Sequence, residues 1–362
     1  MFLTDLRPLY DLPGPWISVY LDASRATERG AEEVGLRWRA ARESLLESGA
    51  DPGRLDQIEK LVSRDHSPGN HGLAIIANAN KPDAAHVEPL PEPPPTTSAE
   101  MGPLPRVMPM LQQRGEQVSW LRIVVDRTGG RIEQAVAGRM HRVESVEGSE
   151  HYPIGKRKPG GWSAPRYQRE AEENWERNAS EVASAAAHMA EEAQAEVLIV
   201  AGDVRARQLL VDELPRHWRE RTVQTDWGGG NGADPERLDD TTHAAVQEIA
   251  VARIEDALDR YRLQSAHGEA ESGLLATVSA LQRGVAEAII VDPSSLDGQH
   301  LWIGPEPAYV ATSESDLLRL GVANPAPVDA GDGLVRTAAC TGAELFVVER
   351  PAFADGVGVL LR

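Results

Sequence analysis

The sequence predicts a mixed α/β protein with three domains. Short apolar runs rich in β-branched residues alternate with longer stretches of helical spacing, which is the pattern of strands joined by helices. A chain of 362 residues is long enough for two or three domains with separate cores, and its 41% apolar and 26% charged residues are ordinary for a globular protein. We place the domains at residues 1–115, 116–234 and 235–362.

The first domain is expected to combine two strands with two helices. Residues 15–22 alternate as a strand does, and residues 71–78 form an apolar run typical of a buried strand. Residues 29–48 and 53–64, which lie between these runs, have helical spacing. The proline-rich residues 89–95 cannot continue a helix or a central strand, so we expect an exposed turn or connection there.

The middle domain begins with a predicted hairpin, residues 120–126 and 131–138, joined by a turn at Thr128-Gly129-Gly130. A helix then begins near Ser163, a good N-terminal cap, with Pro165 in its first turn. An apolar stripe at three- and four-residue spacings predicts its buried face: Tyr167, Ala171, Trp175, Val182, Ala186, Met189 and Ala193. The remaining predicted elements are a strand at 196–201 and a helix near 204–214.

The last domain is predicted to be a compact α/β sandwich. A long helical stretch, residues 235–265, leads into it. Predicted helices then alternate with predicted strands, which favours a layered arrangement. The helices are expected near 272–283 and 313–320, and the strands near 285–292, 307–312, 344–349 and 356–361.

A basic island stands out on an otherwise acidic chain. The formal net charge is −19, yet residues 139–169 contain seven Arg/Lys against three Glu, a local balance of +4. The acidic remainder already provides solubility, so the island indicates a site for a polyanion, and the surrounding negative charge limits indiscriminate nucleic-acid binding. Gly160 and Gly161 within the island permit close backbone approach to a crowded surface.

The run Gly160-Gly161-Trp162-Ser163-Ala164-Pro165-Arg166-Tyr167 resembles the Gly-Gly-Gln loop of archaeal and eukaryotic class I peptide release factors. Ser163, Arg166 and Tyr167 fall in register with that family's motif. The hairpin before the loop and the strand at 196–202 extend the resemblance. More weakly, residues 284–291 resemble a strand of the family's C-terminal domain, which implies an L7Ae-like fold there. The whole pattern is similar to bacterial relatives of release factors and Pelota, particularly Balon-like ribosome hibernation factors of actinobacteria.

The family's glutamine is replaced by Trp162, and this decides the expected chemistry. In the family, that glutamine helps to orient the attacking water; an indole has one N–H donor and no acceptor, so Trp162 cannot take over the role. Gln168 falls inside the predicted helix. We therefore expect no catalytic residues and a non-enzymatic protein.

The same stretch suits contact with rRNA. Trp162 can stack on a nucleobase, the cations can meet phosphates, and Tyr167 can pack at the base of the loop. The predicted rRNA-binding residues are Lys156, Arg157, Lys158, Gly160, Gly161, Trp162, Ser163, Arg166, Tyr167 and Arg169. The alternative is a solvated basic loop with Trp162 folded back onto its own domain.

The resemblance implies a factor that occupies the vacant A site of idle ribosomes, which amounts to ribosome hibernation under stress. The middle domain would face the 23S rRNA of the peptidyl-transferase region, and the first domain would face the 16S rRNA of the decoding centre. The last domain would contact elongation factor Tu. One alternative is a peptidyl-tRNA hydrolase acting on stalled ribosomes; another is a stress-associated binding protein that does not act on ribosomes.

Other candidate sites have simpler interpretations. Asp239-Asp240 with His243 could hold a metal, but acidic residues near a helix start favour the helix dipole. Residues 227–234 read as a flexible linker rather than a phosphate cradle. Arg37-Trp38-Arg39 is a minor candidate for RNA contact, with a solvated helix face as its alternative. Cys340 is expected to be a buried structural thiol.

The sequence contains no motif for a bound metal or cofactor, and we expect neither. It lacks His-Glu-x-x-His, zinc-type Cys/His spacing, a nucleophile elbow and a Walker-type loop. A single cysteine fits a reducing cytoplasm, and no apolar run approaches the length of a membrane span. We therefore expect a cytoplasmic protein with neither a membrane nor DNA as partner.

Overall fold

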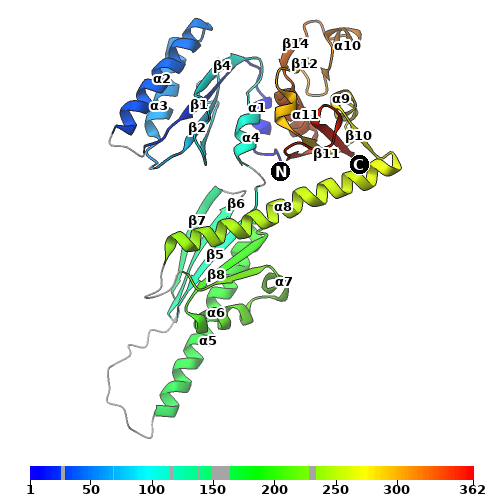
Figure 1. Ribbon diagram of the computed structural model, residues 1–362. Coiled ribbons are helices and arrows are strands. Elements are labelled where there is room, and N and C mark those ends of the chain that lie inside the picture. The colour runs from blue at the N-terminus through cyan, green and yellow to red at the C-terminus, as the bar shows by residue number, and fades with distance from the viewer. Residues whose placement is uncertain are drawn as a thin grey trace. The chain divides into compact units, whose positions relative to one another are not determined.

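A computed structural model gives the structure of the chain except for residues 26–28, 68, 115–116, 127, 137–138, 148–163 and 228–233. The side chains of residues 139–141, 147 and 164–173 are also not described. The chain divides into two compact units (Figure 1): unit 1 is Met1–Glu116 with Ile254–Arg362, and unit 2 is Gln117–Arg253. Both units are mixed α/β, which confirms the predicted fold class. The division into three domains stays a prediction.

The N-terminal segment of unit 1 forms an antiparallel sheet of order β3-β2-β1-β4. Its strands are β1 (Trp16–Asp22), β2 (Gly72–Asn78), β3 (Ala85–Leu90) and β4 (Ser98–Gly102). Helices α2 (Gly30–Glu47) and α3 (Pro52–Arg64) pack on one face through Leu45, Leu55 and Ile58. The two predicted strands and the two predicted helices are confirmed.

The exposed connection expected at residues 89–95 starts later than predicted, because its first residues belong to a strand. Pro89 pairs with Leu73 inside β3. β3 is an edge strand, where a residue without an N–H group costs no ladder hydrogen bond to a further strand.

The opposite face of this sheet shares a core with the C-terminal segment of unit 1. Trp16 and Ile76 belong to the same buried cluster as Leu334 and Val359. Short helices α1 (Arg7–Tyr10) and α4 (Met108–Arg114) contribute to this cluster. The terminal ammonium of Met1 donates a buried hydrogen bond to the Leu345 carbonyl at 2.6 Å. The two ends of the chain therefore stabilise one another.

The C-terminal segment contains a mixed sheet of order β10-β16-β11-β15, formed by Ala270–Ser272, Val357–Leu361, Ala286–Val291 and Glu344–Val347. Helices α9 (Leu274–Gln282) and α11 (Ala330–Thr341) pack on one face. On the other face lies the second half of α8 (Pro235–His267), through Ala257 and Tyr261. These layers form the predicted α/β sandwich.

A smaller antiparallel sheet completes this segment. It has the order β13-β12-β14, formed by Val310–Ala311, His300–Ile303 and Ala326–Asp329. Helix α10 (Glu314–Arg319) packs beside it through Leu317. The strand expected at 307–312 is thus only two residues long. β10, β12 and β14 were not predicted from the sequence.

Helix α11 was also not predicted. Gly331 and Gly333 lower its intrinsic helix propensity, and both lie where neighbouring side chains leave little room for a Cβ. A Cβ on Gly331 would lie 3.2 Å from the Met108 side chain, and one on Gly333 would lie 3.2 Å from Leu301. Cys340 near its end is half-buried rather than buried, and burial raises the pKa of its thiol.

Unit 2 is a five-stranded sheet of order β7-β6-β5-β8-β9. Its strands are β5 (Trp120–Val125), β6 (Gly129–Val136), β7 (Arg139–Glu147), β8 (Val197–Gly202) and β9 (Thr222–Thr225). Helices α5 (Ala164–Glu192) and α6 (Val204–Glu213) pack on one face, with the short α7 (Arg216–Arg219) beside them. The first half of α8 packs on the other face through Leu238 and Ala245. The predicted hairpin, strand and two helices are confirmed, whereas β7 and β9 were missed.

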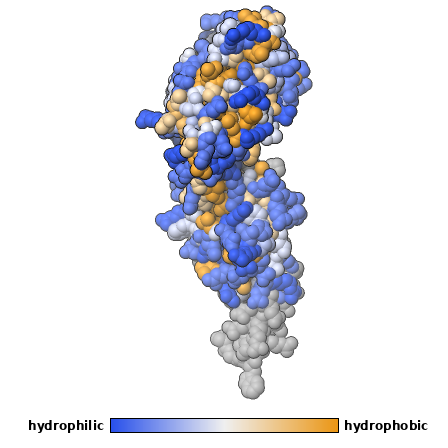
Figure 2. Space-filling model, turned by 90° about the vertical axis from the view of Figure 1, so that its right-hand side faces the viewer, coloured by the Kyte–Doolittle hydropathy of each residue, from blue (hydrophilic) through white to orange (hydrophobic). Residues whose placement is uncertain are grey.

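The visible surface is mostly hydrophilic, as the net charge of −19 requires. Figure 2 shows separate apolar patches on one face, set among hydrophilic side chains. Within the described part of the chain, no helix combines the length and apolar character that crossing a bilayer requires.

A buried carboxylate joins the two segments of unit 1. Asp332 of α11 accepts hydrogen bonds from the backbone N–H groups of Val107 and Met108, at 2.8 and 3.2 Å, at the start of α4. Burial raises the pKa of Asp332 from 3.8 to about 7, and the charge of Asp329 adds to the rise, whereas the two hydrogen bonds and Arg106 oppose it.

We expect Asp332 to make unit 1 less stable as the pH rises. The folded protein retains a proton on Asp332 that the unfolded chain has lost, so the free energy of unfolding falls between pH 3.8 and about 7. Asp332→Asn should remove this fall, measured by urea unfolding at several pH values. The exposed Asp212→Asn is the control and should keep the wild-type profile. Parallel profiles for wild type and Asp332→Asn would contradict the assignment.

Candidate functional site

The predicted rRNA-binding loop connects the end of β7 to the start of α5. Seven of its predicted site residues lie outside the described residues: Lys156, Arg157, Lys158, Gly160, Gly161, Trp162 and Ser163. Arg166, Tyr167 and Arg169 lie in the first two turns of α5, although their side chains are not described. The ten residues lie in one stretch of the sequence, and their contacts and individual roles stay predictions.

Helix α5 gives this loop a fixed base. Val182, Ala186 and Met189 are buried against the sheet, as the predicted apolar stripe requires. The helix crosses β6 so closely that a Cβ on Gly130 would lie 2.9 Å from a methyl group of Val182. Figure 1 shows the first turns of α5 extending past the strands of unit 2. The loop therefore begins at the edge of unit 2.

Two arginines of the strands that precede the loop have carboxylate partners. Arg142 of β7 pairs with Glu144 at 2.5 Å and with Glu192, at the end of α5, at 3.8 Å. Arg131 of β6 pairs with Glu133 at 2.9 Å. By contrast, residues 148–163 contain three Arg/Lys and a single Glu. The loop thus carries a local excess of two positive charges in its own sequence.

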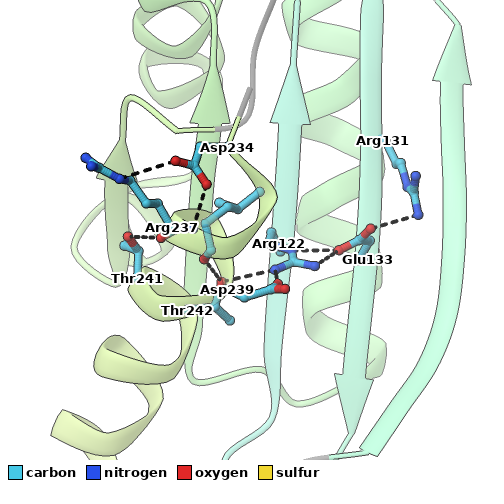
Figure 3. A network of polar contacts seen from close by, with 9 residues as sticks. Arg122, Arg131, Glu133, Asp234, Arg237, Asp239, Thr241 and Thr242 are labelled. Carbon is cyan, nitrogen blue, oxygen red and sulfur yellow. Dashed lines mark hydrogen bonds and ion pairs between the residues drawn. The ribbon is translucent and has the colours of Figure 1, made fainter. Parts of the chain in front are cut away.

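A second polar centre holds the start of α8 against the sheet (Figure 3). Arg122 of β5 and Glu133 of β6 are cross-strand neighbours, and Arg122 Nε donates to Glu133 at 2.6 Å. The same guanidinium pairs with Asp239 of α8 and lies 3.5 Å from the Thr242 hydroxyl. Burial alone would lower the pKa of Arg122, but the hydrogen bonds and negative charges of Asp239 and Glu133 outweigh it and raise the pKa.

Asp239 thus has a structural role in the ion pair with Arg122. No group of three or more His, Cys, Asp or Glu side chains within the described ranges is placed to hold a metal ion. Residues 228–233 of the expected linker are not described. The ring of the preceding residue, Trp227, stacks on the Arg237 guanidinium, whose Cζ lies 4.4 Å from the ring centroid.

Residues 37–39 do not form the solvated helix face that the sequence suggested. Arg37 pairs with Asp22 at 3.1 Å and Glu33 at 3.6 Å. Trp38 is only 3% exposed and belongs to the core of the N-terminal segment, whereas Arg39 is exposed.

The family model described as bacterial archaeo-eukaryotic release factor family 2 matches residues 119–267, from β5 to the end of α8. Two Mycobacterium tuberculosis proteins match nearly the whole chain: uncharacterized protein Rv2629 of strain H37Rv and uncharacterized protein MT2704 of strain CDC 1551. Each is 30% identical over 370 residues, which cover 99% of this chain and 96% of the relative. The chain belongs to bacterial archaeo-eukaryotic release factor family 2.

Solved structures similar to this family member include the archaeal translation termination factor aRF1, at 17% identity over 99% of this chain and 96% of the other, with a TM-score of 0.28. Archaeoglobus fulgidus Pelota matches at 12% identity over 81% and 79%, with a TM-score of 0.30. Saccharomyces cerevisiae Dom34 matches at 8% identity over 81% and 80%, with a TM-score of 0.38.

Removing Arg122 should weaken the folding of unit 2. Arg122→Met leaves the Glu133 carboxylate, only 10% exposed, without its main partner, and we expect a loss of about 2–4 kcal/mol in unfolding free energy. Arg122→Met/Glu133→Met should recover part of this loss, because no buried charge remains unpaired. The control Arg142→Ala removes a half-exposed ion pair and should cost less than about 0.5 kcal/mol. Equal losses for Arg122→Met and Arg142→Ala in urea unfolding would contradict this role.

Proposed function

We propose that this protein is a ribosome-associated factor that occupies the vacant A site of idle ribosomes and thereby contributes to hibernation under stress. The observation that carries the proposal is the loop between β7 and α5. Its Gly-Gly-Trp motif resembles the release-factor Gly-Gly-Gln motif and stands immediately before the long helix α5 in the sequence.

The residue that replaces the family's glutamine supports binding without hydrolysis. Trp162 has no acceptor with which to hold an attacking water, and its body is much larger than that of glutamine. It can instead stack on a base, a contact worth about 1–3 kcal/mol in single-stranded nucleic-acid sites. The proposal therefore assigns Trp162 to rRNA binding and assigns no catalytic residue.

The charge distribution supports an rRNA partner reached through one surface. A chain of net charge −19 repels nucleic acid over most of its surface, whereas the loop carries Lys156, Arg157 and Lys158 in succession. The proposal places these cations against 23S rRNA and the N-terminal segment against 16S rRNA. It includes a contact of the C-terminal segment with elongation factor Tu, which rests on the family resemblance alone.

The proposal is tested by comparing ribosomes whose A site is vacant with ribosomes that carry A-site tRNA. The protein should co-sediment with the first and not with the second. Lys156→Ala/Arg157→Ala/Lys158→Ala should weaken binding. It should also reduce the slope of log binding constant against log salt concentration by about two to three, because fewer counterions are released.

Arg205→Ala/Arg216→Ala/Arg262→Ala is the matched control, since it removes the same charge from exposed positions on α6, α7 and α8. This control should bind as the wild type does. Equal binding to both kinds of ribosome would refute A-site occupancy. An unchanged salt dependence in the loop variant would refute the role of the three cations.

Substitutions of Trp162 separate binding from hydrolysis. Trp162→Ala should weaken ribosome binding by about 5- to 150-fold, and Trp162→Phe should retain most of the affinity because its ring can still stack. Neither the wild type nor Trp162→Gln should release peptide from ribosomes bearing peptidyl-tRNA, because a restored glutamine alone does not hold the surrounding loop in the geometry that ester attack requires. Release by the wild type above the spontaneous rate would instead establish the hydrolase alternative.

A further inference from the structure

A cavity of about 570 Å³ lies inside unit 1, between its N-terminal and C-terminal segments. Residues of β1, β4 and the connection after β4 line one side, and residues of β12, β14 and α11 line the other. The volume is in the range of small-molecule sites, roughly 300–1,000 Å³. No lining residue adjoins an undescribed position in the sequence, and none belongs to the β7–α5 loop.

One oxygen of a buried carboxylate opens into this cavity. Asp332 is only 4% exposed and is one of the lining residues. Its Oδ1 accepts the backbone N–H groups of Val107 and Met108, which fixes the orientation of the carboxylate. Its Oδ2 accepts no hydrogen bond within the described part of the chain, yet it is not one of the wholly enclosed side-chain atoms. Because Asp332 borders the cavity, a ligand there can reach Oδ2.

The lining of the cavity is negatively charged. Three carboxyl groups, those of Glu100, Asp329 and Asp332, face one guanidinium, that of Arg106. Arg106 is already paired with Glu100 at 2.9 Å. Asp329 accepts the Gly331 N–H at 2.9 Å, and among the described residues neither Asp329 nor Asp332 forms an ion pair. An ionised carboxylate only accepts hydrogen bonds, so the complementary ligand is a cation that donates them.

The position of the cavity favours a small molecule over a peptide. β4 and β14 are both edge strands, and consecutive residues of each, 100–102 and 327–329, line the cavity. Consecutive side chains of a strand point to opposite faces, so the cavity runs along the two strand edges. Pro327 has no N–H group to donate to an added strand, which disfavours a peptide that would pair with β14.

We propose that this cavity binds a small aliphatic amine in its ammonium form. The ammonium donates to Asp332 Oδ2, and the alkyl chain lies along the apolar part of the wall, which includes Met101 and Leu104. An ammonium group has three donors, so the same group or a second amino group can also reach Asp329. The site does not depend on the A-site proposal.

Binding of an ammonium group should displace the proton of Asp332. Burial raises the pKa of this carboxyl to about 7, so below that pH the free protein carries a proton that the ligand must replace. The other charged or ionisable groups around it are Arg106, Arg336, Asp329, Glu100, Tyr10 and Tyr20. Burial raises the pKa of both tyrosines, so neither titrates below pH 8. Aliphatic ammonium groups such as that of lysine lose their proton only near pH 10.4, roughly, so the ligand stays charged.

The test measures binding to the isolated full chain by calorimetry, without ribosomes. The probes are putrescine, uncharged 1,4-butanediol and a lysine-containing tetrapeptide with blocked ends. Putrescine should bind, with an affinity that rises about tenfold between pH 6 and pH 8, and it should release about one proton at pH 6. Buffers of different ionisation enthalpy report that proton. Butanediol should not bind, and the tetrapeptide should bind no more tightly than putrescine.

Matched variants decide whether binding occurs in this cavity. Asp332→Asn keeps an oxygen for the two backbone N–H groups. It should weaken binding at pH 8 by at least about tenfold and remove the proton release, because a charge-assisted hydrogen bond is lost. Asp329→Asn keeps a good helix cap and should weaken binding less. His300→Gln should keep the pH dependence, which separates Asp332 from the one histidine that lines the cavity.

The control Asp212→Asn removes the same charge from an exposed position on α6 and should bind as the wild type does. Equal weakening by Asp332→Asn and Asp212→Asn would mean that the acidic surface merely attracts counterions, and would overturn the proposal. So would butanediol binding as tightly as putrescine, or a proton release that Asp332→Asn retains. Much tighter binding of the tetrapeptide would overturn the assignment to a small amine.

Discussion

The packing of α5 on the sheet of unit 2 is the contact on which the candidate site depends. The close approach of Val182 to Gly130 fixes the helix on β6, and the β6–β7 ladder fixes the other end of the loop. These two anchors lie outside residues 148–163. In the proposed function, Trp162 in place of the family's glutamine therefore alters the chemistry of the loop and leaves the scaffold unchanged.

Sequence patterns predicted the elements whose side chains alternate strongly between core and solvent. The β5–β6 hairpin and α5 have such patterns, and both are confirmed. β7 was missed because it is an edge strand with many exposed polar side chains, so it lacks a buried apolar run. α11 was missed although Asp329 caps its start and Gly342 its end, because Gly331 and Gly333 disfavour a helix locally.

The candidate site and the cluster at residues 37–39 differ in how far the sequence could predict them. The β7–α5 loop has a local motif and a local excess of charge, so its residues could be named from the sequence, although their contacts could not. The environment of the Arg37-Trp38-Arg39 cluster depends instead on how α2 packs on its sheet, which the sequence does not specify locally. Arg37 proved to be paired, Trp38 belongs to the core, and Arg39 is exposed.

The shared core of unit 1 has a consequence for the order in which the chain folds during synthesis. Met1 and Leu345 are hydrogen-bonded across 344 positions, so almost the whole chain must leave the ribosome before this contact can form. Unit 2 is continuous in sequence and has a separate core, so it can be completed while the N-terminal segment still lacks its partner. Until then the apolar face of β1 and β2 that carries Trp16 and Ile76 stays uncovered by the C-terminal helices, which makes nascent chains of intermediate length the most prone to aggregate.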